Sequence, residues 1–122
     1  MMPSFSKRSL DNLATCHPDL QKVAHECIKT FDFVVICGHR GASAQNKAYA
    51  EGQSKLKFPN SKHNKSPSLA FDATPHPLDW GDIDSFKAMG KAMKAAAKTV
   101  GVKIKWGGDF RGFFDGPHVE LA

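Results

Sequence analysis

Residues 69–73, Leu69-Ala70-Phe71-Asp72-Ala73, form a predicted strand whose two faces differ in chemistry. Successive side chains of a strand point to opposite faces of a sheet, so the first, third and fifth residues share one face, which is apolar. Ala70 and Asp72 share the other face. A core is therefore expected against the first face, and Asp72 is expected to point away from it.

The residues around this strand alternate between helical and strand patterns. Helical spacing of apolar residues, with Ser43 as the cap of the second run, predicts helices over residues 17–31, 43–50 and 82–100. Short apolar or alternating runs predict strands over residues 33–37, 102–106 and 118–121. Polar stretches with prolines predict loops over residues 53–67 and 74–81. This mixed order, without an internal repeat, indicates an α+β fold.

The length and composition suit a single globular domain over residues 1–122, with 41% apolar and 24% charged residues. The longest strongly apolar run, Phe33–Cys37, is far shorter than the ~20 residues that span a bilayer. The N-terminus has no apolar stretch of signal-peptide length, and the three cysteines cannot all pair. The protein is therefore expected in the cytoplasm, with reduced and mostly buried thiols.

The net charge of +5 favours an anionic partner, such as nucleic acid, lipid head groups or an acidic cell-wall polymer. Charge alone does not choose among these partners. No basic run interleaved with aromatic residues indicates a nucleic-acid surface, so binding to nucleic acid is not expected. A small basic nucleic-acid-binding domain is a weaker alternative, which would bind DNA with a steep salt dependence.

Three short segments hold residues that could bind a metal ion: Ser61-Lys62-His63, Phe71-Asp72 and Asp115-Gly116-Pro117-His118-Val119-Glu120. Two imidazoles and one carboxylate suit zinc, and three protein ligands leave a fourth position for water. Asp115 precedes His118 across a Gly-Pro turn and could take a proton from that water. Glu120 shares a strand face with His118 and could hydrogen-bond a ligand histidine; the alternative is a solvated acid on an edge strand.

These segments resemble the zinc D-Ala-D-Ala carboxypeptidase superfamily (VanY-like), and within it most closely the phage endolysins that are L-alanyl-D-glutamate peptidases. The likeness rests on Ser61-Lys62-His63, Ala70-Phe71-Asp72 and the segment from Asp115 to Glu120. Residues 106–110 resemble the family's glycine-rich segment, and Arg40 with residues 43–46 resembles its arginine-bearing turn and helix. The resemblance implies a small antiparallel sheet with flanking helices, like that of the hedgehog and D-Ala-D-Ala peptidase proteins.

By this resemblance, one Zn²⁺ is held by His63, Asp72 and His118. Asp115 is implied to be the catalytic base, and Arg40 is implied to steady the substrate or the oxyanion. The sequence differs from many relatives in two ways, because the gap between His63 and Asp72 is longer and the base is an aspartate instead of a glutamate. The longer gap is expected to form a loop, and the shorter base has less reach.

The resemblance implies a zinc metallopeptidase that hydrolyses the L-Ala–D-Glu bond of peptidoglycan stem peptides and so lyses bacteria. It further implies storage in the host bacterial cytoplasm and access to the wall after membrane permeabilisation. A monomer is expected, without stable membrane insertion and without a separate cell-wall-binding domain. The alternatives are a D-Ala-D-Ala carboxypeptidase or dipeptidase, or a non-catalytic peptidoglycan-binding zinc module, against which Asp115 argues.

Overall fold

A four-stranded antiparallel sheet organises the computed structural model, which describes residues 3–122. The strands lie in the order β1-β2-β4-β3, with bounds β1 (Phe33–Cys37), β2 (Ala70–Pro75), β3 (Ile104–Trp106) and β4 (His118–Leu121). The helices are α1 (Lys7–Leu13), α2 (Pro18–Cys27), α3 (Ala42–Ala50) and α4 (Ile83–Val100). Two 3₁₀ turns are η1 (Lys62–Asn64) and η2 (Gly107–Asp109). The predicted α+β class is confirmed.

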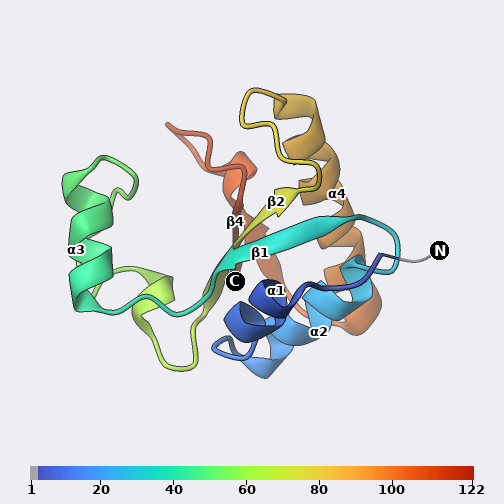
Figure 1. Cartoon of the computed structure of the whole chain (residues 1–122), viewed down its shortest axis with the longest axis horizontal. Helices are drawn as coiled ribbons and strands as arrows, with labels where there is room; N and C mark the ends of the chain where they lie inside the picture. The colour runs from blue at the N-terminus through green and yellow to red at the C-terminus, as the bar shows by residue number, and fades with distance from the viewer. Residues whose placement is uncertain (1–2) are drawn as a thin grey trace.

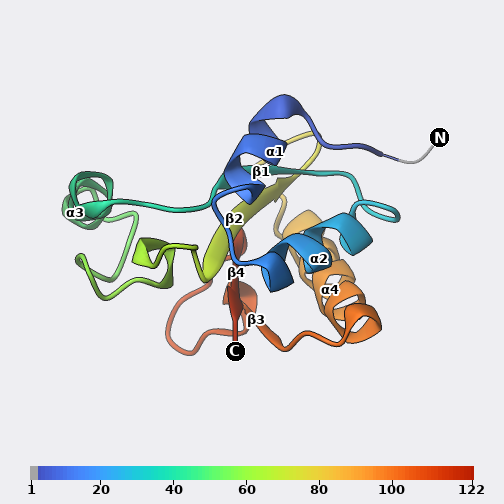
Figure 2. The same cartoon turned by 90° about the horizontal axis from the view of Figure 1, so that it is seen from below.

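The helices cover the sheet unevenly. Figures 1 and 2 show α2 and α4 close together on one side of the molecule, with α3 set well apart from them. Helices α2 and α4 pack on each other and on the sheet, and they enclose a core that includes Leu20, Met93, Phe71 and Val119. Because Phe71 and Val119 face this core, the residues next to them in β2 and β4 face the opposite side of the sheet. That opposite side carries Asp72.

Helix α4 begins and ends where its sequence predicts. The Asp82 side chain caps the N-terminus by accepting a hydrogen bond from the Ser85 N–H at 3.1 Å. Gly101 follows the helix with a φ of 76°, a left-handed conformation that glycine adopts without a steric penalty. The apolar stripe between these ends places Met89 and Met93 in the core.

Several local expectations differ from the structure. Strand β3 begins at Ile104 instead of residue 102, and β2 extends to Pro75, into the predicted loop. Helix α1 was not predicted, because it has only seven residues and its burial comes from packing on β1. Helix α2 ends at Cys27, before the predicted end at Phe31, because a turn follows it. The predicted cap at Ser43 is wrong: Gly41 occupies the N-cap of α3, and Ser43 lies inside the first turn.

We expect Gly90→Ala to destabilise the fold by about 1–3 kcal/mol, because it overpacks the contact between α4 and Trp106. A Cβ at Gly90 would lie 2.4–2.7 Å from ring atoms of Trp106. The ring has little freedom to shift, since its Nε1 donates a hydrogen bond to the Gly116 carbonyl oxygen at 2.7 Å. The higher helix propensity of alanine, about 1 kcal/mol, acts in the opposite direction. Urea unfolding measures the difference.

The exposed neighbour Lys91 provides the control for this prediction. Lys91→Ala should change the free energy of unfolding by no more than about 0.5 kcal/mol, as is usual for surface positions. A free energy of unfolding for Gly90→Ala that equals or exceeds that of the parent would contradict the prediction and show that Trp106 has room to move.

Candidate metal centre and active site

The sheet places Asp72 of β2 directly opposite His118 of β4. His63 reaches the same face from η1. The Ser61 hydroxyl accepts a hydrogen bond from the His63 N–H at 3.2 Å, and Asn64 completes a capping box, so the turn that carries His63 is itself held in place. Residues far apart in the sequence are thus brought to one point by two neighbouring strands and one capped turn.

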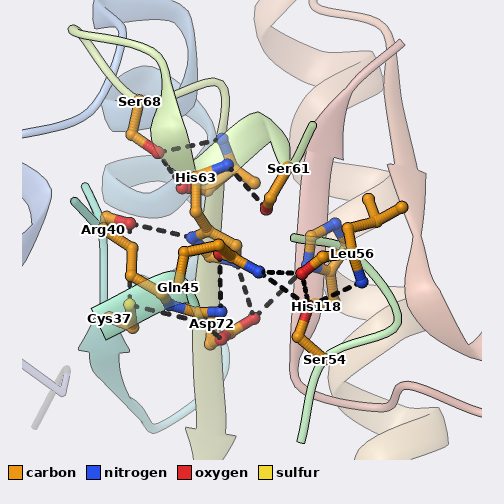
Figure 3. Close-up of polar contacts among 12 residues, drawn as sticks. Cys37, Arg40, Gln45, Ser54, Leu56, Ser61, His63, Ser68, Asp72 and His118 are labelled. Carbon is orange, nitrogen blue, oxygen red and sulfur yellow. Dashed lines mark hydrogen bonds and ion pairs between the residues drawn. The ribbon is translucent and has the colours of Figure 1, made fainter. Parts of the chain in front are cut away.

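The three predicted ligands meet at the Asp72 carboxylate. Its Oδ1 lies 3.3 Å from Nε2 of His63 and 3.4 Å from Nδ1 of His118. Figure 3 shows these side chains gathered around one point, and the His63 side chain is only 3% exposed. The long gap between His63 and Asp72 closes on itself, because the Leu69 N–H donates to the Lys62 carbonyl oxygen at 3.0 Å. The predicted loop therefore absorbs the extra residues.

In each histidine, the ring nitrogen that faces away from Asp72, here called the outer nitrogen, has a hydrogen-bond partner. These partners decide which ring nitrogens carry protons. Nδ1 of His63 lies 2.8 Å from the Gly38 carbonyl oxygen, which can only accept, so Nδ1 carries the proton. Nε2 of His118 lies 2.8 Å from Oε1 of Glu120, and the same argument places a proton on Nε2. In their neutral forms, both rings therefore turn an unprotonated nitrogen toward Asp72.

Three acceptors that face one point require a cation between them. Nε2 of His63 is buried and has no hydrogen-bond partner among residues 3–122. A proton on one imidazole or a metal ion would satisfy it. Two imidazoles and one carboxylate, with partners that hold their outer atoms, are the donor set of a zinc site that keeps one position for water. The residues present thus fit the metal that the sequence predicts.

The pKa values of the metal-free protein reflect the same arrangement. Burial lowers the pKa of His63, but the Asp72 carboxylate and, after it, Cys37 outweigh burial and raise it to about 10. Burial raises the pKa of Asp72, but the adjacent imidazoles of His118 and His63 outweigh burial and hold it well below its usual range. The Asp72 carboxylate therefore stays ionised at neutral pH and attracts a cation to the site.

Arg40 is a close neighbour of Asp72. Its Nη2 donates to Oδ2 of Asp72 at 3.2 Å, and its Nη1 donates to Oε1 of Gln45 at 3.1 Å. The buried Gln45 donates in turn to the Leu56 carbonyl oxygen at 2.6 Å. Arg40 thus holds one oxygen of Asp72 while the other oxygen faces the two histidines. This contact gives Arg40 a positioning role, beside the substrate or oxyanion role that the resemblance implies.

Glu120 connects the site to Lys62. Its Oε1 accepts the hydrogen bond from His118, and its Oε2 pairs with Nζ of Lys62 at 2.9 Å. Burial raises the pKa of Glu120, but His118 and Lys62 outweigh burial and lower it to about 2. The predicted hydrogen bond to His118 is present. The alternative of a solvated acid on an edge strand is wrong, because β4 lies between β2 and β3.

Asp115 lies in the turn that leads into β4. Its carbonyl oxygen accepts a hydrogen bond from the His118 N–H at 3.1 Å, and its own N–H donates to the Gly107 carbonyl oxygen at 3.0 Å. A Cβ at Gly107 would lie 2.1 Å from the Asp115 carbonyl oxygen, so only glycine lets η2 approach this turn so closely. Burial and the charge of Asp72 raise the pKa of the Asp115 carboxyl, which therefore lies within the field of the centre.

Cys37 is a residue of the site that the sequence analysis missed. Ligand atoms of Cys37, His63 and Asp72 all lie within 4.8 Å of one another, so they form a second candidate ligand set. Burial raises the pKa of the Cys37 thiol, but the nearby His63 imidazole and the Arg40 guanidinium outweigh burial and lower it. Cys16 and Cys27 are free and buried, as predicted. The pairing of β1 with β2 aligns Cys37 with Asp72, and this pairing distinguishes Cys37 from the other two cysteines.

The fold and the site together define a class of protein: an α+β domain whose antiparallel sheet carries a His-Asp-His cluster on one face, with an aspartate in the adjoining turn. The family model of the phage L-alanyl-D-glutamate peptidases matches residues 1–122. The chain belongs to this family.

Two relatives and one solved structure agree with this assignment. The L-alanyl-D-glutamate peptidase of Escherichia phage T5 is 37% identical over 134 aligned residues, which cover 97% of this chain and 97% of that protein. The L-alanyl-D-glutamate peptidase of Listeria phage A118 is 46% identical over 44 residues, which cover 36% of this chain and 14% of that protein. The crystal structure of the Serratia marcescens L-Ala D-Glu endopeptidase ChiX has a TM-score of 0.84 and 29% sequence identity, over 97% of this chain and 89% of that one.

Proposed function

We propose that this protein is a zinc-dependent endopeptidase that hydrolyses the bond between L-Ala and D-Glu in peptidoglycan stem peptides. The observation that carries the proposal is the convergence of His63 and His118 on one oxygen of Asp72, at 3.3 and 3.4 Å. The choice of bond follows from membership of a peptidase family named for it and from a relative that matches over nearly the whole chain.

The ligand atoms in this proposal are Nε2 of His63, Oδ1 of Asp72 and Nδ1 of His118. Zinc bound there would polarise the scissile carbonyl and lower the pKa of the attacking water towards ~7. Gly38 and Glu120 hold the outer nitrogens of the two rings, and they thereby decide which nitrogen is free to bind a metal.

Asp115 serves as the general base. It takes a proton from the attacking water and later returns this proton to the leaving amine of D-Glu. The raised pKa of Asp115 suits the first step, because a carboxylate with a higher pKa is a stronger base toward the attacking water. Arg40 holds Asp72 in position and, as the resemblance implies, steadies the oxyanion or a substrate carboxylate.

The proposal extends to phage-induced lysis, since the relative that matches over nearly the whole chain is a phage protein. A monomer made in the host bacterial cytoplasm would reach peptidoglycan after a separate protein permeabilises the membrane. None of the helices within residues 3–122 is both long and apolar enough to cross a membrane.

Amino-terminal labelling of digested peptidoglycan tests the bond. We expect new D-Glu amino termini to appear, while L-Ala stays attached to muramic acid. A D-Ala-D-Ala carboxypeptidase or dipeptidase would release D-Ala without D-Glu termini. That result would contradict the proposed bond but would not contradict the proposed metal centre. A non-catalytic module would yield neither product. Protein treated with a chelator is the matched control and should produce no new termini.

A further inference from the structure

An apolar pocket of about 180 Å³ opens beside the turn that carries Asp115. It is lined by Trp80, Ile83, Phe86, Phe114, Gly116 and Pro117. None of these side chains is charged, and none belongs to the metal centre. The lining comes from the loop before α4, the first turns of α4 and the loop before β4, so segments far apart in the sequence build one hollow.

Three large side chains of this lining are strongly exposed: Trp80 at 57%, Ile83 at 44% and Phe114 at 44%. Trp80 also stacks on Phe86, with ring centroids 5.7 Å apart and an interplanar angle of 18°. Phe86 therefore supports one face of the indole and leaves the remaining surface of Trp80 accessible. A single exposed apolar residue is ordinary, but several from separate segments around one hollow indicate a ligand site.

The pocket adjoins the turn that links Asp115 to His118. Gly116 and Pro117 line the pocket and also form the turn between Asp115 and His118. A Cβ at Gly116 would lie 2.8 Å from the Phe114 ring, so glycine is required for this ring to approach the turn. A group bound in the pocket would therefore lie against the backbone that positions the proposed base.

The guanidinium of the site lies on the other side of Asp72. Arg40 follows β1, whereas Pro117 leads directly into β4, and β1 and β4 are the two neighbours of β2 in the sheet. The Asp72 carboxylate of β2 lies between these two sides. The site thus has the apolar pocket beside the start of β4 and the Arg40 guanidinium on the β1 side, while the Lys62–Glu120 ion pair lies two residues farther along β4.

The two halves of the proposed substrate differ in the same way. On the L-Ala side, the muramyl carboxyl is consumed in the amide bond, so the sugar and the alanine methyl carry no charge. On the other side, D-Glu keeps a free carboxylate, which would lose its hydration in an apolar pocket without gaining a partner. The chemistry of the pocket therefore suits only the first half.

We propose that this pocket binds the N-acetylmuramyl-L-alanyl half of the substrate, with Trp80 stacked against the apolar face of the sugar ring. The inference rests on the proposed function and deepens it, because it assigns a direction to the substrate. D-Glu then lies toward Arg40. The muramyl group contributes binding energy that a bare stem peptide lacks.

Two soluble substrates with the same stem peptide test the pocket, one carrying N-acetylmuramic acid on L-Ala and the other only an acetyl group. The parent protein should have the higher kcat/KM on the muramyl substrate. Trp80→Ala should lower the ratio of the two kcat/KM values about tenfold, chiefly through KM. Leu78→Ala is the matched control, because Leu78 is in the same loop and 47% exposed but does not line the pocket. An unchanged ratio in folded Trp80→Ala would overturn the inference and leave the proposed function intact.

Tryptophan fluorescence supplies a measurement that needs no hydrolysis. The chain has two tryptophans, of which Trp106 is buried and Trp80 is exposed, so a ligand that covers Trp80 should shift the emission to shorter wavelength. The probe is N-acetylmuramyl-L-alanine, and N-acetyl-L-alanine is the control ligand. Phe114→Ala, which keeps both tryptophans, should weaken the response severalfold. If the parent cleaves neither substrate, the proposed bond is wrong, and the absence of a saturable shift would separately overturn the pocket assignment.

Discussion

Asp115→Asn should remove nearly all turnover of the stem peptide, while the zinc content and the fold should stay as in the parent. The substitution keeps the size of the side chain but replaces a proton acceptor with an amide, which does not take up a proton from water. A general base contributes about 10²–10⁴-fold, so kcat should fall at least about a hundredfold. The Asp115 carboxylate is not among the groups that converge on the proposed metal position. Steady-state kinetics and metal analysis of one preparation measure both quantities.

Two companion variants sharpen this prediction. Asp115→Glu should keep part of the activity, because it restores a carboxylate and the resemblance places glutamate at this position in many relatives. Asp11→Asn is the control for the chemical change itself, since Asp11 pairs with Lys7 on the surface at 2.8 Å and lies outside the site. A kcat of Asp115→Asn within tenfold of the parent value, or a loss of zinc as large as that of Asp72→Asn, would contradict the assigned role.

Asp72→Asn should empty the metal centre and abolish activity with it. Asp72 presents one oxygen to both histidines, and its charge raises the pKa of His63 against the effect of burial. An amide is a neutral and weaker ligand. Loss of a group that only hydrogen-bonds to a ligand costs about 10–100-fold in metal affinity, so the loss of a direct ligand should exceed about a hundredfold. Competition with a chelator of known zinc affinity measures the change.

The same titration decides between the two candidate ligand sets. If His118 is a ligand, His118→Ala loses zinc and Cys37→Ser keeps it. The opposite result would make Cys37 the third ligand, with His63 and Asp72. Retention of zinc by Asp72→Asn would contradict both sets. Circular dichroism of each metal-free variant separates a lost ligand from a lost fold.

Local sequence determined most of the helices and strands of this protein and most of the residue types in its site. Alternation over residues 69–73 predicted that Asp72 turns away from the core, and the structure confirms it, because Phe71 and Ala73 are fully buried in the core while Asp72 faces the histidines. The bounds of α4 followed from a capping aspartate and a terminal glycine. Caps and periodicity depend on residues within one or two turns, so the sequence alone contains them.

Tertiary structure decided which of these residues meet. The strand order places β4 beside β2, and the register of this pair sets His118 opposite Asp72. The same packing gives Arg40 its contact with Asp72, brings Cys37 into the site and joins Trp80 to the loop before β4. Each of these contacts links segments that are distant along the chain, and each forms because the sheet must bury one face against α2 and α4. Register and strand order are properties of that shared core, and no local pattern of residues specifies them.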